Sequence, residues 1–190
     1  MFELGLSEQL ELLALARRTL EFFCGAGHVL DYRPRYPALE IPAGVFVSLR
    51  RQETLRGCVG RVRSDSPLHQ SVRELALAAA FEDPRFPPVV GDELHQLAIE
   101  ISVLSPGTSV TDPAEIQIGT HGLLITQGPH HGVLLPQVAA QCGWDSVRFL
   151  EETCVKAGLP RQSWRHGAAV EKFSAQVFAE GRLVLNTSVL

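Results

Sequence analysis

The stretch from Thr54 to Gly60 (TLRGCVG) constrains the fold most, because it carries two glycines inside a β-type pattern. In a strand, successive side chains point to opposite faces of the sheet, so Arg56 and Cys58 are expected on one face and Gly57 on the other. A glycine inside a strand lets another backbone or a ligand come close. The stretch therefore predicts a thiol and a guanidinium on one sheet face, beside open backbone.

Two interpretations of Cys58 stay open from these residues. Unpaired cysteines are among the most buried residue types, and strand glycines often mark tight packing, so Cys58 can be a small core side chain. A reactive cysteine instead needs a nearby positive charge or a helix N-terminus. Arg56, two residues away on the same predicted face, would supply that charge.

Hydrophobic periodicity predicts an α+β protein. Strict alternation predicts strands, and apolar residues at helical spacing predict helices. The strands are expected over residues 45–50, 55–59, 97–104 and 173–178, and the helices over 7–23, 66–82, 136–140 and 146–157. A short break at 51–53 indicates one hairpin, and the apolar runs 122–126 and 132–135 indicate a second hairpin with a long turn. Hairpins with interspersed helices favour a largely antiparallel sheet with flanking helices.

Several helix ends carry capping residues. Ser7 and Ser66 are predicted to cap the first two helices, and Asp145 the last one, because their side chains can accept a hydrogen bond from a free backbone N–H. Cys24 falls at the end of the first helix and Cys154 on the apolar face of the last helix. Both cysteines are predicted to pack.

The length of 190 residues suits one domain over residues 1–190, with two sub-lobes as an alternative. A net charge of −4 and a pI near 6.0 argue against a general nucleic-acid binder. Residues 33–63 nevertheless carry seven arginines and no lysine. Arginine forks suit phosphate and carboxylate groups, so an anionic ligand or RNA stays open as a partner.

The four cysteines include no Cys-x-x-Cys pair, so neither a zinc site nor a dithiol is predicted. His130 and His131 are adjacent, and adjacent side chains seldom point at one ion, so no metal site is predicted. The acidic start does not resemble a signal peptide, and the longest apolar run, residues 75–81, is too short to span a bilayer. These features predict a reduced, cytoplasmic protein.

Candidate partners for Cys58 come from other parts of the chain. His121 is the best candidate base, since a Cys–His pair needs spatial proximity only. Glu100 would orient that base or bind a ligand amine, with a polar sheet face as the simpler interpretation. Asp83 and Arg85 either form a structural turn or line the edge of a cleft.

Residues 55–60 (LRGCVG) resemble the signature hexapeptide of the AMMECR-type domain family, called AmmeMemoRadiSam system protein A in microbes. Val59 stands where isoleucine is commoner. Further blocks agree in order, and the resemblance covers nearly the whole chain. These blocks are DPRFPP at 83–88, IEISVL at 99–104, HGL at 121–123, GVLLPQV at 132–138, GWD at 143–145, KAGLP at 156–160 and Trp164.

The resemblance implies an α+β fold of two unequal lobes around a cleft. It also implies the genomic company of a Memo-type protein, similar to metal-dependent dioxygenases, and of a radical SAM enzyme. It implies no particular reaction or cofactor. Two hypotheses follow: an enzyme or enzyme component centred on Cys58, and a non-catalytic adaptor that binds a partner protein or a small anionic ligand. For the first, Cys58 and His121 are the candidate catalytic residues, and Arg56, Gly57, Gly60, Arg85 and Glu100 the candidate ligand-binding residues.

Overall fold

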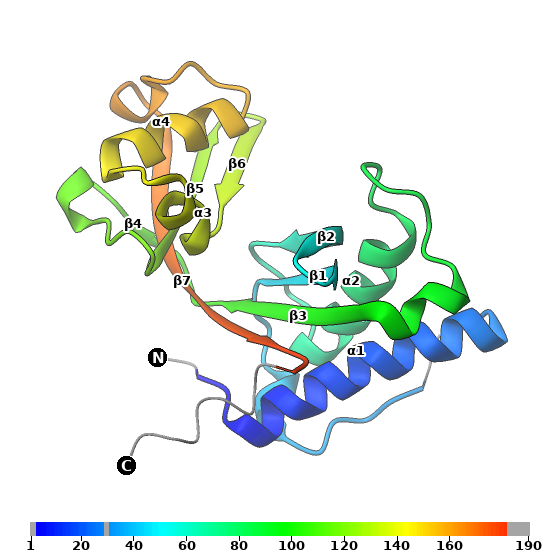
Figure 1. The fold of residues 1–190 in the computed structure, drawn as a ribbon. Coiled ribbons are helices and arrows are strands. Elements are labelled where there is room, and N and C mark those ends of the chain that lie inside the picture. Colours follow the sequence, from blue (N-terminus) through cyan, green and yellow to red (C-terminus); the bar gives the residue numbers. More distant parts are fainter. Residues whose placement is uncertain (1–2, 29–30, 182–190) are drawn as a thin grey trace, which may run out of the picture. The chain divides into compact units, whose positions relative to one another are not determined.

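The computed structural model describes residues 3–28 and 31–181 (Figure 1). The chain divides into two compact units. Unit 1 comprises the residues up to Val103 and those from Gln176 on, and unit 2 runs from Leu104 to Ala175. Both units combine helices with antiparallel strands, so the predicted α+β class is confirmed. The single domain over residues 1–190 and the cleft between lobes stay predictions.

Unit 1 is a sheet with helices packed on one face. The strands lie in the order β2-β1-β3, followed by the last residues of β7. The inward residues of these strands and the apolar faces of α1 and α2 form one core. The elements are α1 (Leu6–Ala26), η1 (Pro37–Glu40), β1 (Val45–Arg51), β2 (Thr54–Arg61), α2 (Leu68–Phe81), η2 (Gly91–Gln96), β3 (Leu97–Leu104) and the end of β7 (Ala169–Ala179).

Unit 2 has its own sheet and core. The first part of β7 pairs with β5 and with the short strand β4, and β5 pairs with β6. Helices α3 and α4 cover this sheet around the fully buried Phe149. The elements are β4 (Thr108–Ser109), η3 (Pro113–Glu115), β5 (His121–Gln127), β6 (His130–Leu134), α3 (Pro136–Cys142), α4 (Ser146–Lys156) and η4 (Ser163–Arg165).

Both predicted hairpins are confirmed, but the second turn is tighter than expected. Gln127 faces His130, so only Gly128 and Pro129 form the loop. Gly128 adopts a positive φ of 56°, which glycine tolerates and most other residues do not. His130 and His131 therefore belong to β6 and not to a long turn.

The first helix begins earlier and ends later than predicted. Its N-cap is Gly5, whose N–H donates to the Glu8 carboxylate, so Ser7 lies inside the helix. The buried residues of α1 end at Thr19 and Leu20, and the last turn carries no core residue. Cys24 in that turn is exposed, and its predicted packing role is wrong.

The other predicted caps had mixed outcomes. Pro67, not Ser66, is the N-cap of α2. Asp145 caps α4 as predicted and accepts a hydrogen bond from the Arg148 N–H. Cys154 lies in the core, as predicted.

Candidate functional site

Three polar side chains face one another across β2, β1 and β3. Cys58 is opposite Ser48, and Ser48 is opposite Glu100. Val47 and Leu49, on either side of Ser48, belong to the apolar core, so the three polar residues lie on the other face of the sheet. Ser48 and Glu100 are buried and Cys58 is partly buried. We call this set the Cys58–Ser48–Glu100 row.

The Cys58 thiol is hydrogen bonded within this row. The Ser48 hydroxyl donates to Sγ at an Oγ–Sγ distance of 3.2 Å. At the other end of the row, the Glu100 carboxylate lies 3.8 Å from Nε of Arg50. Sequence reasoning missed Ser48 as a site residue. The position of the β1–β2 turn was the available signal, because it sets which residues of a hairpin are opposite one another.

The backbone of Cys58 is held from the outer edge of β2. Its N–H donates to Oδ2 of Asp83 at 2.9 Å, and its carbonyl oxygen accepts from Nη2 of Arg85 at 2.9 Å. Asp83 and Arg85 also bind each other, with distances of 2.9 Å for Nε–Oδ1 and 2.6 Å for Nη2–Oδ2. The pair satisfies backbone groups that an edge strand leaves unpaired. We call it the Asp83–Arg85 clamp.

The two members of the clamp differ in burial and support each other's charge. The side chain of Asp83 is 3% exposed and that of Arg85 is 54% exposed. The hydrogen bond from Arg85 holds the pKa of Asp83 well below its usual range, against the opposing effect of burial. The pKa of Arg85 is raised, first by the hydrogen bond to Asp83 and further by the Cys58 side chain. The guanidinium beside the thiol is therefore that of Arg85.

Arg56 is not on the Cys58 face, and that prediction is wrong. The register of the hairpin shifts at Arg50, which faces Leu55, so Arg56 is an extra residue in β2. Such a β-bulge reverses the expected alternation on one side of the extra residue. Leu55 takes the register position on the Cys58 face, and Arg56 forms an ion pair with Glu93, with Nε–Oε1 at 2.6 Å.

The strand glycines are sites of close packing. A Cβ at Gly57 would lie 2.0 Å from the carbonyl oxygen of Ala79 in α2, and a Cβ at Gly60 would lie 2.1 Å from the ring of Phe46. The predicted close approach to these glycines is confirmed, and the approaching groups are the protein's own. We therefore assign both glycines to packing and not to ligand binding.

His121 is the first residue of β5 and belongs to unit 2, whereas Cys58 belongs to unit 1. Its Nδ1 accepts a hydrogen bond from the Gln117 N–H at 3.0 Å, which leaves Nε2 as its other ring nitrogen. Burial, and secondly the charge of Lys172, lowers the pKa of His121 from 6.5. The role of His121 as the base for Cys58 stays a prediction.

The contact between His121 and Gln117 predicts a pH dependence of stability. Because the folded protein lowers the pKa of His121, the neutral ring stabilises the fold, fully above about pH 6.5 and progressively less as pH falls through the folded pKa. His121→Ala should lower the free energy of unfolding by about 1 kcal/mol at pH 8, and this difference should shrink toward pH 5. Urea denaturation at four pH values measures it.

His121→Asn is the matched control, since its side-chain oxygen can accept from Gln117 without titrating. We expect the Asn variant to keep most of the stability that the Ala variant loses at pH 8. A difference between wild type and His121→Ala that is independent of pH would contradict this interpretation.

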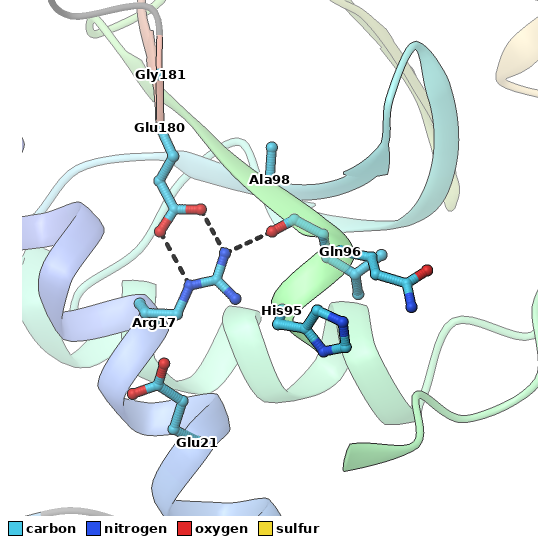
Figure 2. A pocket seen from close by; sticks show the side chains of 8 residues that line it. Arg17, Glu21, His95, Gln96, Ala98, Glu180 and Gly181 are labelled. Atoms are coloured by element: carbon cyan, nitrogen blue, oxygen red, sulfur yellow. Dashed lines mark hydrogen bonds and ion pairs between the residues drawn. The ribbon is translucent and has the colours of Figure 1, made fainter. Parts of the chain in front are cut away.

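A pocket of about 530 Å³ in unit 1 is lined by other residues, from α1, β3 and the end of β7 (Figure 2). Arg17 lies at its centre, and each of its guanidinium nitrogens already donates to a protein oxygen. Nε donates to Glu180 at 3.0 Å, Nη1 to the Leu94 carbonyl at 2.8 Å and Nη2 to the Leu97 carbonyl at 2.5 Å. With its donors engaged, Arg17 joins three elements and is not a ligand-binding group.

Two further searches returned nothing in the described part of the chain. None of its helices combines the length and the apolar composition that a membrane span requires. No group of three or more His, Cys, Asp or Glu side chains among residues 3–28 and 31–181 is arranged to hold a metal ion.

The fold and the site define an α+β protein with a cysteine on a clamped edge strand. The AMMECR1 family model matches residues 13–178, and the chain belongs to this family. The resemblance of the LRGCVG hexapeptide and the following blocks is thus confirmed.

The chain is similar to relatives along most of its length. It is 41% identical to a protein of Methanosarcina acetivorans over 177 residues, which are 87% of this chain and 88% of that protein. It is 40% identical to protein PF1979 of Pyrococcus furiosus over 186 residues, 89% of this chain and 86% of that one. Its structure is similar to the crystal structure of the uncharacterized protein PH0010 from Pyrococcus horikoshii, with a TM-score of 0.84, 38% identity and 90% of each chain covered.

Proposed function

We propose that this AMMECR1-family protein is an enzyme, or a component of an enzyme, whose reacting group is the Cys58 thiol. The environment of Sγ carries the proposal: the Ser48 hydroxyl donates to the sulfur, and the Arg85 guanidinium interacts with the same side chain. Reactive cysteines occur at partly exposed positions with positive neighbours, and Cys58 has both properties. The sulfur would bond to an electrophilic atom of a substrate.

Other residues of the site have proposed roles around this thiol. Glu100 would bind a positively charged group, since its carboxylate is buried and its nearest cation, Nε of Arg50, is 3.8 Å away. Arg85 is half exposed and would hold an anionic group. His121 is proposed as the acid or base, through its Nε2. Family membership supports joint action with a Memo-like protein and a radical SAM protein.

Alkylation rates test the proposal. We expect iodoacetamide to react with Cys58 faster than with Cys24 and Cys142 in the folded protein, with the rates mapped by peptide mass spectrometry. Cys24 and Cys142 are exposed and Cys58 is only partly buried, so accessibility alone predicts the opposite order. Cys154 is buried and should react only after unfolding.

The same experiment can contradict the proposal. A Cys58 that reacts more slowly than both exposed cysteines at every pH would make the thiol a packing residue. If Cys58 is fast, substrate screening with wild type and Cys58→Ser follows. Loss of turnover in a folded Cys58→Ser variant is the expected result.

One observation favours a second function, a non-catalytic adaptor. Within the described residues of unit 1, the side-chain contacts that the structure gives Cys58 are to Ser48 and Arg85, and neither is a general base. The Memo-like and radical SAM proteins are the proposed partners for this function as well. An adaptor should co-purify with stoichiometric partners equally well as wild type and as Cys58→Ser.

A further inference from the structure

We infer that Asp83 is a positioning residue for the Cys58 thiol and acts through the clamp that it forms with Arg85. The inference rests on the proposed function of Cys58 and extends it to a residue outside that proposal. Asp83 does not touch the sulfur. It binds the backbone of Cys58 and the guanidinium that lies beside the thiol.

The backbone at Cys58 needs such support. β2 is an edge strand in the order β2-β1-β3, so its outward N–H and carbonyl groups have no strand partner. Gly57 precedes Cys58 and is conformationally permissive, and the extra residue Arg56 interrupts the ladder just before it. Asp83 and Arg85 hold the N–H and the carbonyl of Cys58 from opposite ends of one residue. This two-point contact orients the Cα–Cβ bond of Cys58.

The clamp also places the positive charge. Nη2 of Arg85 donates both to Oδ2 of Asp83 and to the carbonyl oxygen of Cys58, so the carboxylate determines where the guanidinium lies. An arginine that is 54% exposed would otherwise sample many rotamers. The turn that carries Asp83 is itself ordered, since the Phe86 N–H donates to the Asp83 carbonyl at 3.1 Å.

Asp83 stays charged under the conditions of the experiment. Its pKa is held well below the usual carboxyl range, first by the hydrogen bond from Arg85. The other charged groups near Cys58 are Arg50 on β1 and Glu100 on β3, and Arg56 on β2 is paired with Glu93. These groups remain in Asp83 and Arg85 variants, so they do not account for a change that such variants produce.

The test compares Asp83→Asn and Arg85→Lys with a matched control, Glu74→Gln. Glu74 binds Arg61, which also lies on β2, at 3.0 Å, but does not touch Cys58. Since a displacement of about 1 Å can cost a reacting group on the order of 100-fold in rate, we expect alkylation of Cys58 to slow by about tenfold in Asp83→Asn. Its pH–rate profile should move to higher pH, because the guanidinium is no longer held beside the sulfur.

Arg85→Lys keeps a positive charge without the fork, so we expect a smaller decrease in rate. Glu74→Gln should match wild type in rate and profile, and Cys24 and Cys142 give internal reference rates in every variant. A folded Asp83→Asn variant with an unchanged or faster Cys58 and an unchanged profile would overturn the inference. If Asp83→Asn does not fold, Arg85→Lys carries the same test at an exposed side chain.

Amide hydrogen exchange separates this inference from the proposed function. The Cys58 N–H should exchange faster in Asp83→Asn than in wild type and Glu74→Gln, whatever the reactivity of the thiol. A slow Cys58 in wild type, together with this faster exchange, contradicts the proposed function and leaves the clamp intact. Unchanged exchange in Asp83→Asn overturns the clamp itself.

Discussion

Gly57→Ala is expected to lower the free energy of unfolding by about 3 kcal/mol, at the upper end of the cost of overpacking a core. The new Cβ would lie 2.0 Å from the carbonyl oxygen of Ala79 and 3.1 Å from its carbonyl carbon. These are backbone atoms at the end of α2, and they cannot rotate away as a side chain can. Either β2 or the end of α2 must shift. Urea denaturation monitored by circular dichroism measures the loss.

Gly25→Ala is the matched control for this substitution. Gly25 lies inside α1, and a Cβ there would meet nothing within 4 Å. Alanine is favoured over glycine in a helix interior, so Gly25→Ala should raise the free energy of unfolding by about 0.5–1 kcal/mol. A Gly57→Ala variant as stable as wild type would show that β2 and α2 are not in close backbone contact.

Asp83→Asn is expected to lower the free energy of unfolding by about 3 kcal/mol at pH 7, because charge-assisted hydrogen bonds to a buried carboxylate are lost. The carboxylate accepts from the Cys58 N–H and from the N–H, Nε and Nη2 of Arg85. Asparagine keeps the volume of the side chain but carries no charge. The effect is placed at the lower end of the range for a broken buried pair, since Arg85 is half exposed.

The cost of Asp83→Asn should depend on pH in a defined direction. The folded protein lowers the pKa of Asp83 below its reference value of 3.8, so the stabilisation is fully present above about pH 4. It is lost as pH falls below that value toward the folded pKa. Wild type and variant should therefore differ by a constant amount from pH 7 to pH 5 and converge below pH 4.

Glu74→Gln again serves as the control, since Glu74 and Arg61 form an exposed ion pair with side chains 50% and 49% exposed. Such pairs contribute about 0–1 kcal/mol, so this variant should remain close to wild type. Equal losses in the two variants, or a loss in Asp83→Asn that persists unchanged at pH 3, would contradict a buried, charged Asp83.

Much of the fold follows from the sequence by itself. Period-two alternation located β1, β2, β3 and β7, and helical spacing located α1, α2 and α4, because these patterns express burial of one face. The hexapeptide at residues 55–60 and the blocks after it indicated the family, which the match over residues 13–178 confirmed. The site also came partly into view, since Cys58, Arg85 and Glu100 were all singled out.

The tertiary structure decided which of these residues act together. Alternation placed Arg56 beside Cys58, but one extra residue in β2 reverses the faces on one side of it, and no periodicity shows where a bulge falls. The positive group beside the thiol is Arg85, brought there by an Asp83 carboxylate that binds Cys58 across 25 positions of sequence. A contact over that separation depends on how α2 packs on the sheet, and that packing is a property of the whole core.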